Sequence, residues 1–314
     1  MSGSPRPAPV TAVPGRIRRC VLAGGSGAVG GLFTGLLTGA GIDVCVVDPA
    51  PPAAGAVVRH LPGDVTAPDE ALRAELAATD LLLLAVPEEA ALEAVRATAG
   101  SLRPGALLAD TLSVKTRIAA AVADRAAGRE AVGLNPMFAP SLGLDGRPVA
   151  AVVLRDGPLV TELLALVTGN GGRVVRVGAE RHDRLAAASQ ALTHATVLAF
   201  GHALAGLDVD IEELAALAPP PHAALLALLA RIASGTPEVY WDIQSANPYA
   251  GRAREALASG AARLEDITRD GDEKAFAHFL HELSGGLGDR LPHYRDLCAE
   301  LFTRIPAAAP KDAS

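Results

Sequence analysis

The sequence predicts an α/β protein in two parts, a doubly wound parallel sheet followed by an all-helical domain. Short, almost wholly apolar runs alternate with helical stretches through the first half of the chain, as expected of a parallel sheet covered on both faces. After about residue 179 the strand signals stop and only helical patterns follow. Aromatic residues form 3% of the chain while alanine, leucine and valine supply most of its apolar half, which favours this architecture over a β-sandwich.

Seven short apolar runs are the expected strands of the first domain, and a helix is expected over residues 30–38. Cys20 and Cys45 lie inside the first two runs, so we expect them to be buried as small hydrophobic groups. With Cys298 they lack the spacing of a metal site. The runs are residues 20–23, 44–47, 81–86, 106–109, 131–133, 150–154 and 173–177.

The second domain is expected to be a series of helices separated by prolines and glycines. A chain of 314 residues is long enough for two domains, each with its own core. The expected helices are residues 181–207, 211–217, 223–234, 252–269, 273–283 and 290–304. The predicted division is a disordered tail at 1–16, a dinucleotide-binding domain at 17–179, a helical substrate and dimerisation domain at 180–306, and a disordered tail at 307–314.

Charge and hydropathy argue against two classes of partner. The net charge is −7 and the chain has no dense basic patch, which argues against a nucleic-acid surface. No apolar run reaches the ~18 residues that a membrane span needs. The first 15 residues are rich in proline and lack an apolar signal core, so we expect a cytoplasmic protein.

A glycine-rich segment predicts a dinucleotide site. The run Gly25-Ser-Gly27-Ala28-Val29-Gly30 follows an expected strand and opens a helix. Its first glycine is expected to allow a tight turn, the second a close approach to the pyrophosphate, and the third close packing of helix on strand. Strand, glycines, helix, strand and an acidic residue in this order indicate a Rossmann-type domain.

The acidic residue favours NAD as the cofactor. Asp48 lies 18 residues after Gly30, near the ~20 typical of the carboxylate that binds the adenosine ribose, where it would repel a 2′-phosphate. Two alternatives stay open: Asp48 as a turn residue before a proline, and Arg59 as a partner for the 2′-phosphate of NADP. Val86 and Pro87 are expected in a loop that passes over the cofactor.

The segment Gly133-Leu-Asn-Pro-Met-Phe-Ala-Pro140 resembles Gly-Leu-His-Pro-Met-Phe-Gly-Pro of bacterial prephenate dehydrogenases of the kind fused to chorismate mutase. Other segments resemble landmarks of that family in the same order, along nearly the whole chain after the tail. The resemblance implies a homodimer with intertwined helices, and we expect any mutase to be a separate chain. The landmarks are Asp110-Thr-Leu-Ser113-Val-Lys115, Glu180-Arg-His182-Asp183, Gln190-Ala-Leu-Thr-His194, Val239-Tyr240-Trp-Asp242-Ile243 and Gly286-Leu-Gly288-Asp289.

Asn135 departs from the family pattern. In that family a histidine at this position takes the proton from the 4-hydroxyl of prephenate while hydride leaves the same carbon, and a neutral amide cannot act as that base. A 4-amino substituent needs no base, because its lone pair stabilises the cation and loss of carbon dioxide leaves a neutral aniline. The amide carbonyl can also accept a hydrogen bond from N–H.

We therefore expect an NAD-dependent enzyme that converts 4-amino-4-deoxyprephenate to 4-aminophenylpyruvate, a step toward 4-aminophenylalanine. One alternative is a weak prephenate dehydrogenase that makes 4-hydroxyphenylpyruvate for tyrosine, with Asn135 only in an Asn-Pro turn. A second alternative is an NAD-binding regulatory protein with a degenerate substrate pocket.

The resemblance implies roles for other residues of the substrate site. Ser113 would orient the ring substituent and residue 135, although on chemistry alone it is equally a helix cap. Lys115 either aids a substrate carboxylate or is solvated. Gln190 and His194 are four residues apart, hence on one helix face, and both are expected at the substrate. Arg231 would grip a carboxylate of the dicarboxylate substrate, against a surface arginine otherwise.

Two further positions lie in the same part of the sequence. His182 is expected to flank Gln190 and His194. A second family arginine is missing, with Ala223 at the aligned position and His222 beside it, which is another departure that an altered ligand would explain.

Overall fold

A computed structural model of the chain describes residues 15–51, 58–126, 128–269 and 271–305. The chain forms two compact units, residues 1–184 and 185–314. The predicted tails lie outside the described residues, apart from residues 15 and 16. The predicted boundary after residue 179 differs from the observed one after residue 184, because His182 and Asp183 bond to groups of the first unit.

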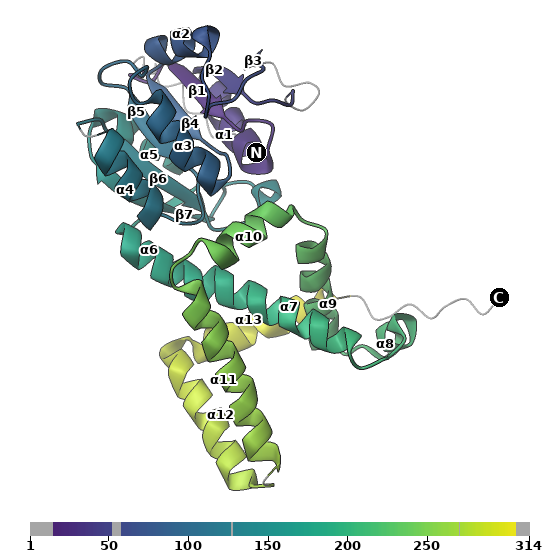
Figure 1. The fold of residues 1–314 in the computed structure, drawn as a ribbon. Coiled ribbons are helices and arrows are strands. Elements are labelled where there is room, and N and C mark those ends of the chain that lie inside the picture. Colours follow the sequence, from purple (N-terminus) through teal and green to yellow (C-terminus); the bar gives the residue numbers. More distant parts are fainter. Residues whose placement is uncertain (1–14, 52–57, 127, 270, 306–314) are drawn as a thin grey trace, which may run out of the picture. The chain divides into compact units, whose positions relative to one another are not determined.

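The first unit is an eight-stranded sheet with the order β3-β2-β1-β4-β5-β6-β7-β8 (Figure 1). All neighbouring strands are parallel except β6 and β7. The strands are β1 (Arg19–Ala23), β2 (Asp43–Val47), β3 (Arg59–Leu61), β4 (Leu81–Leu84), β5 (Leu107–Asp110), β6 (Ala131–Pro136), β7 (Pro148–Arg155) and β8 (Arg173–Arg176).

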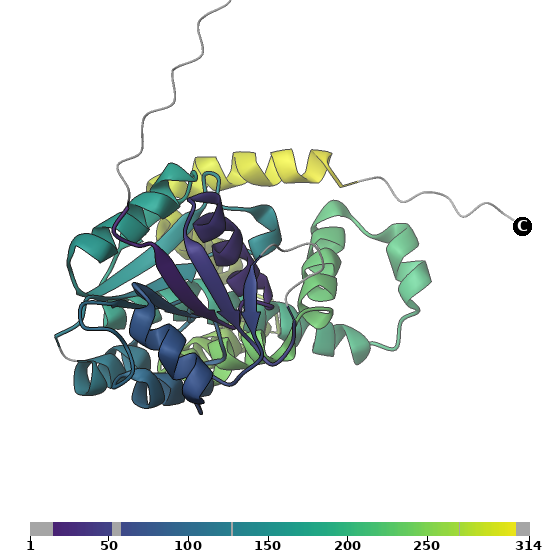
Figure 2. The same ribbon diagram turned by 90° about the horizontal axis from the view of Figure 1, so that it is seen from above.

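Helices cover both faces of this sheet, which explains why its inner strands are largely apolar. Leu81 and Leu83 of β4 belong to the core under α1 (Ala28–Gly39) and α5 (Pro158–Gly169). Leu82 and Leu84 point to the other face and belong to the second core. The helices over that face are α2 (Glu70–Ala78), α3 (Glu88–Thr98) and α4 (Thr116–Arg125), and Figure 2 gives a second view of the arrangement.

The observed sheet differs from the expected one in two places. The short strand β3 was not among the seven expected runs, because its sequence Arg59-His-Leu61 is mostly polar and half-exposed at the sheet edge. Strand β7 is antiparallel to β6, since residues 137–147 between them contain one short 3-10 turn and no crossover helix. Cys20 and Cys45 are buried in β1 and β2 as predicted.

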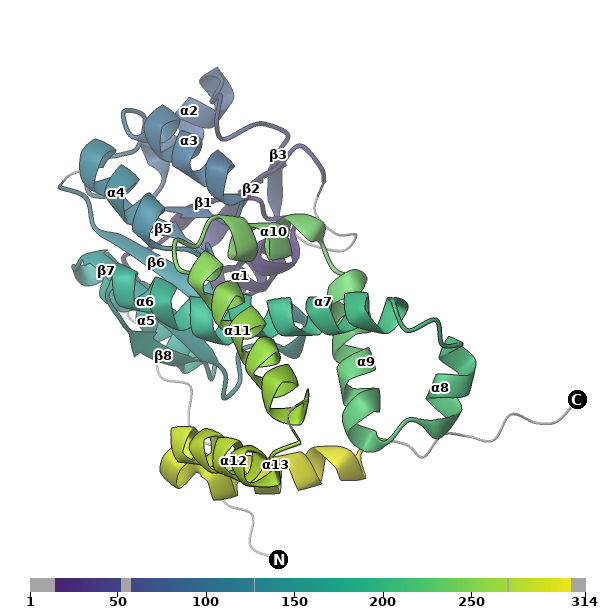
Figure 3. The same ribbon diagram turned by 60° about the horizontal axis from the view of Figure 1, so that its bottom comes forward.

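The second unit is all-helical, as predicted. Its long first helix is broken by a π-helical turn at Ala187–Ala191, and α9 begins at Pro220, since proline is tolerated in a first helical turn. Helices α7 and α9 pack together, and α11 and α12 form an antiparallel pair (Figures 1 and 3). The helices are α6 (Ala179–Ala186), which begins in the first unit, α7 (Leu192–Ala205), α8 (Ile211–Leu217), α9 (Pro220–Ala233), α10 (Pro237–Ser245), α11 (Ala250–Arg269), α12 (Glu273–Leu287) and α13 (Leu291–Thr303). Among the described helices, none combines the length and apolarity that crossing a bilayer requires.

Candidate functional site

The glycine-rich turn between β1 and α1 fits a bound dinucleotide, with one correction to the predicted roles. The left-handed turn is made by Gly24, whose φ is 82°, and not by Gly25. A Cβ on Gly25 would lie 2.6 Å from the Val46 side chain, so only glycine at this position lets the turn pack closely against strand β2. A Cβ on Gly30 would lie 2.1 Å from the Gly24 carbonyl oxygen, which is the predicted close packing of helix on strand.

Gly27 has a different role from the other glycines. A Cβ there would meet only the Gly24 carbonyl oxygen, at an ordinary 3.4 Å, so packing inside the protein does not require this glycine. Gly27 is the N-cap of α1 and supplies no side-chain cap to the backbone N–H groups of the first turn, which begins at Ala28 and Val29. Those donors are free to bind an anion such as a pyrophosphate, and because Gly27 has no side chain the anion can approach the backbone closely.

A cleft of about 390 Å³ at the carboxyl ends of β1, β2 and β4 contains the predicted cofactor residues Gly27, Asp48, Val86 and Pro87. The Asp48 carboxylate accepts hydrogen bonds from the backbone N–H groups of Ser26, at 3.1 Å, and Ala50, at 3.0 Å. It therefore shapes the local turn and still has lone pairs for a ribose diol. The two interpretations of Asp48 are compatible.

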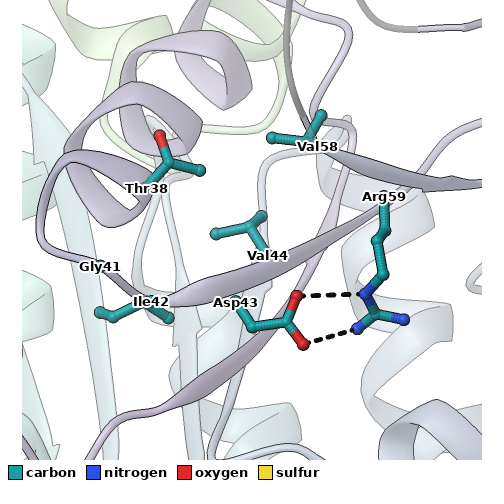
Figure 4. Close-up of a pocket in the computed structure, with 7 residues that line it drawn as sticks. All are labelled: Thr38, Gly41, Ile42, Asp43, Val44, Val58 and Arg59. Atoms are coloured by element: carbon teal, nitrogen blue, oxygen red, sulfur yellow. Dashed lines mark hydrogen bonds and ion pairs between the residues drawn. The ribbon is translucent and has the colours of Figure 1, made fainter.

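Arg59 is engaged elsewhere in the first unit. Its guanidinium binds the carboxylate of Glu75, at 2.7 Å, and that of Asp43, at 3.1 Å, and these two partners raise the pKa of Arg59. Figure 4 shows the pairing of Arg59 with Asp43. The hollow that Arg59 lines includes Ile42 and Asp43 at the amino end of β2, whereas cofactors of this fold bind at carboxyl ends. A 2′-phosphate would have to displace two carboxylates, which favours NAD.

Replacing Asp48 with alanine is expected to narrow the preference for NAD over NADP. Loss of a charged hydrogen-bond partner of the ribose should lower kcat/KM for NAD by about 10- to 100-fold. Kinetics with both cofactors measure the change, and Asp124→Ala, which removes an exposed carboxylate outside the cleft, is the control. A wild-type enzyme that prefers NADP would refute the assignment of Asp48.

Asn135 lies at the carboxyl end of β6 and is 2% exposed. Its amide nitrogen lies 3.1 Å from Nε2 of His182, and Nδ1 of His182 lies 2.8 Å from the Asp183 carboxylate. Asp183 also accepts hydrogen bonds from the backbone N–H groups of Lys115, at 2.8 Å, and Thr116, at 2.9 Å. A buried hydrogen-bonded chain therefore runs from the start of α4 to the side chain at position 135.

Asp183 decides between the two interpretations of Ser113. The backbone donors at the start of α4 are satisfied by the Asp183 carboxylate, so Ser113 is not the helix cap. The Ser113 side chain is half-buried, and its hydroxyl has no hydrogen-bond partner among the described residues. It is left available for a ligand.

The structure supports neither interpretation of Lys115. The side chain is fully buried, pairs with the Asp110 carboxylate and donates a hydrogen bond to the Leu134 carbonyl at 2.8 Å. Burial lowers the pKa of the Lys115 ammonium, and Asp110 opposes that shift. A Cβ on Gly133 would lie 2.9 Å from Asp110, so the glycine of the motif makes room for this pair. Lys115 thus anchors the end of β6 beside Asn135.

In the second unit the π-helical turn Ala187–Ala191 contains Gln190 and is followed by His194. Two side-chain atoms, Oε1 of Gln190 and Nδ1 of His194, are buried and have no hydrogen-bond partner among the described residues. Burial, followed by the charge of Arg231, lowers the pKa of His194, so its imidazole is neutral at pH 7. Buried polar atoms without partners are costly, and a polar ligand would satisfy them. Turns of this type are frequent at functional sites.

Arg231 is exposed on α9 and makes no ion pair with any residue that the structure describes. It is therefore free to bind a carboxylate. His222 is adjacent in sequence to Ala223, which stands at the position of the family's second arginine. The His222 ring packs edge-on against Phe200 with ring centroids 5.6 Å apart, and its Nε2 is buried without a partner among the described residues. His194 packs in the same way on Tyr240, at 5.0 Å.

The predicted residues thus fall into two groups, one in each unit. His182 was expected only to flank Gln190 and His194, and Asp183 was given no role, although both belong to a segment that resembles the family; in the structure they bond to Asn135 and to each other. Their signal in the sequence was an adjacent histidine and aspartate at the entrance to the helical region, and the pairing with Asn135 was visible only in the fold.

Comparison with known proteins supports the family resemblance. Residues 43–150 match the family described as prephenate dehydrogenase, nucleotide-binding domain, and residues 178–282 match prephenate dehydrogenase, dimerization domain. The chain is 56% identical to 4-amino-4-deoxyprephenate dehydrogenase of Streptomyces pristinaespiralis over 91% of its own length and 97% of that protein. It is 26% identical to the T-protein of Haemophilus influenzae, over 87% of the chain and 68% of that protein.

Solved structures share the fold. The crystal structure of prephenate dehydrogenase from Aquifex aeolicus in complex with hydroxyphenyl propionate and NAD+ aligns with a TM-score of 0.71 at 19% identity, covering 87% of this chain and 98% of that one. Synechocystis arogenate dehydrogenase aligns with a TM-score of 0.62 at 19% identity, covering 87% and 99%.

Proposed function

Because the chain belongs to the prephenate dehydrogenase family, we propose that it oxidises and decarboxylates 4-amino-4-deoxyprephenate to 4-aminophenylpyruvate with NAD as acceptor. The observation that carries the substrate assignment is Asn135, which occupies the position of the family's proton-accepting histidine. The relative that is 56% identical has this activity in its name, which supports the same assignment here.

The amino substrate makes chemical sense of an amide at position 135. Hydride leaves ring carbon 4, and the lone pair of the amino group stabilises the cation that develops there. The C–C bond to the carboxylate on carbon 1 then breaks, its electrons make the ring aromatic, and carbon dioxide departs. Bound NAD supplies the hydride acceptor. The product amine is neutral, so no residue has to remove a proton from the substituent during hydride loss.

The protein's own groups bind and orient this substrate. Arg231 supplies a bidentate partner for a carboxylate, and Gln190 and His194 supply polar atoms that have no partner among the described residues. Asn135 accepts a hydrogen bond from the substrate N–H, and Ser113 binds beside it. These groups act by positioning, because the proposed reaction needs no general base at the ring substituent.

Side-by-side turnover of the two dienes tests the proposal. We expect wild type to reduce NAD with 4-amino-4-deoxyprephenate much faster than with prephenate, followed as absorbance of the reduced cofactor. The rate on the amine should rise with pH as the unprotonated amine forms, because an ammonium group has no lone pair for the cation. Turnover of neither substrate, together with tight NAD binding, would indicate the regulatory alternative.

We infer that the enzyme is a homodimer formed through its helical unit, whose family is described as a dimerization domain. The fully buried apolar core of the described part of this unit is small, with Ala191, Ile243 and Ala250 as its cluster. Two helices carry exposed apolar stripes at helical spacing that a second copy would cover. They are Phe276, Leu280, Leu283 and Leu287 on α12, and Leu291, Tyr294, Leu297 and Leu301 on α13.

The proposed substrate also implies a pathway context. A mutase reaction must supply the cyclohexadiene, and we assign it to a separate chain. We place the enzyme in the cytoplasm, where NAD and the other substrates of amino acid synthesis are available.

A further inference from the structure

The buried pair His182–Asp183 lies behind Asn135 and has no part in the chemistry described so far. We propose that His182, held by Asp183, is a positioning residue that fixes the Asn135 amide with its carbonyl oxygen free, and that this orientation makes the site selective for an amino substituent. The inference rests on the proposed function, since it concerns how that same site reads its substrate.

The surroundings of Asp183 fix where the proton of the pair lies. Asp183 is fully buried, and burial alone would raise its pKa. Hydrogen bonds from His182 and from Thr116 and Lys115 lower the pKa below its ordinary value, so the group is a carboxylate that can only accept. Nδ1 of His182, at 2.8 Å, must therefore carry the proton.

His182 in turn fixes the orientation of the Asn135 amide. The Asn135 atom that lies 3.1 Å from Nε2 of His182 is the amide nitrogen, which can only donate a hydrogen bond. Nε2 is therefore the acceptor, which agrees with the proton of the ring lying on Nδ1. The carbonyl oxygen of Asn135 is left as the free polar atom, and it has no hydrogen-bond partner among the described residues.

The orientation of the Asn135 amide determines how it meets the substituent on ring carbon 4. An amino group has one lone pair, and that lone pair must delocalise into the cation at ring carbon 4. An amide N–H facing the amine would bind this lone pair and hold it out of the reaction, whereas a carbonyl oxygen binds an N–H and leaves the lone pair free. A hydroxyl has two lone pairs, so it is less sensitive to which end of the amide it meets.

A pair of matched variants tests this role. His182→Asn keeps a polar group near Asp183 but is too short to reach Asn135, while His182→Gln is one methylene longer and can present an acceptor to the Asn135 amide. We expect His182→Asn to lower the ratio of kcat/KM for the amine to kcat/KM for prephenate by about tenfold, the size of one hydrogen bond. His182→Gln should recover most of that ratio, and the KM for NAD should change little in both.

A double-mutant cycle shows whether His182 acts through Asn135. In an Asn135→Ala background, His182→Asn should not change the substrate ratio further, because the amide that it orients is gone. Thermal unfolding checks that each variant folds, and His182→Phe replaces His182→Asn in the same assays if that variant does not fold.

Two results would overturn the inference: an equal loss on both substrates in His182→Asn, or additive effects on the ratio in the cycle. Either would mean that His182 only supports the fold. The proposed function fails separately, if wild type itself prefers prephenate.

Discussion

Asn135→His is expected to raise kcat/KM on prephenate, by up to about 10²-fold, and to lower it on the 4-amino analogue. The imidazole restores a proton acceptor beside a 4-hydroxyl, where the wild-type amide has none. Nε2 of His182 lies 3.1 Å from the present amide nitrogen and could accept an N–H from the new ring, which would orient it. Steady-state kinetics with both substrates measure the exchange of preference, and the missing arginine near Ala223 would reduce the gain.

Arg231→Ala is the matched control for this experiment. It should reduce activity on both substrates alike, because Arg231 is expected to bind a carboxylate that the two share. The substrate assignment is wrong if wild type turns over prephenate briskly and ignores the amine. Asn135 would then be a tolerated turn residue, and water or His194 would have to take the proton.

The helical unit is expected to depend on dimerisation for its folding. Wild type should be a dimer by light scattering at micromolar concentration, with an interface well over ~2,000 Å² and an unfolding temperature that rises with protein concentration. Leu283→Asp places a charge in the middle of the α12 stripe, where Leu283 is 54% exposed in one chain. A buried leucine lost on both sides of a two-fold interface costs at least about 4 kcal/mol, so dimerisation should weaken by roughly 10³-fold or more.

His281→Asp is the matched control, since it puts the same charge on α12 about 140° around the helix from Phe276, the first residue of the stripe. It should leave the dimer and its helical circular dichroism unchanged, while Leu283→Asp should lose helical signal at low concentration. A wild-type monomer whose unfolding does not depend on concentration would contradict the proposal.

Local patterns in the sequence determined the type of fold and the class of cofactor. Apolar runs such as residues 81–86 can be stable only between two helical layers, and the structure places alternate leucines of β4 in the two cores. The glycine motif and Asp48 predicted the cofactor end of the sheet, because those tasks depend on residues near one another in the chain. Asn135 was recognisable as a departure because it lies within a short motif.

Only the tertiary structure decided what surrounds these residues. Asn135 and His182 are 47 positions apart in the chain, and no local pattern predicts their hydrogen bond. The same is true of Lys115 and Asp183, which are 68 positions apart. Lys115 was expected to be solvated or bound to substrate, because a buried ammonium group is stable only beside a partner. The folded structure supplies that partner by placing the Asp110 carboxylate next to the Lys115 ammonium. The sequence alone gives the identity of the residue at position 135. The orientation of the Asn135 amide depends on the Asp183 carboxylate, which folding brings into contact with the opposite side of the His182 ring.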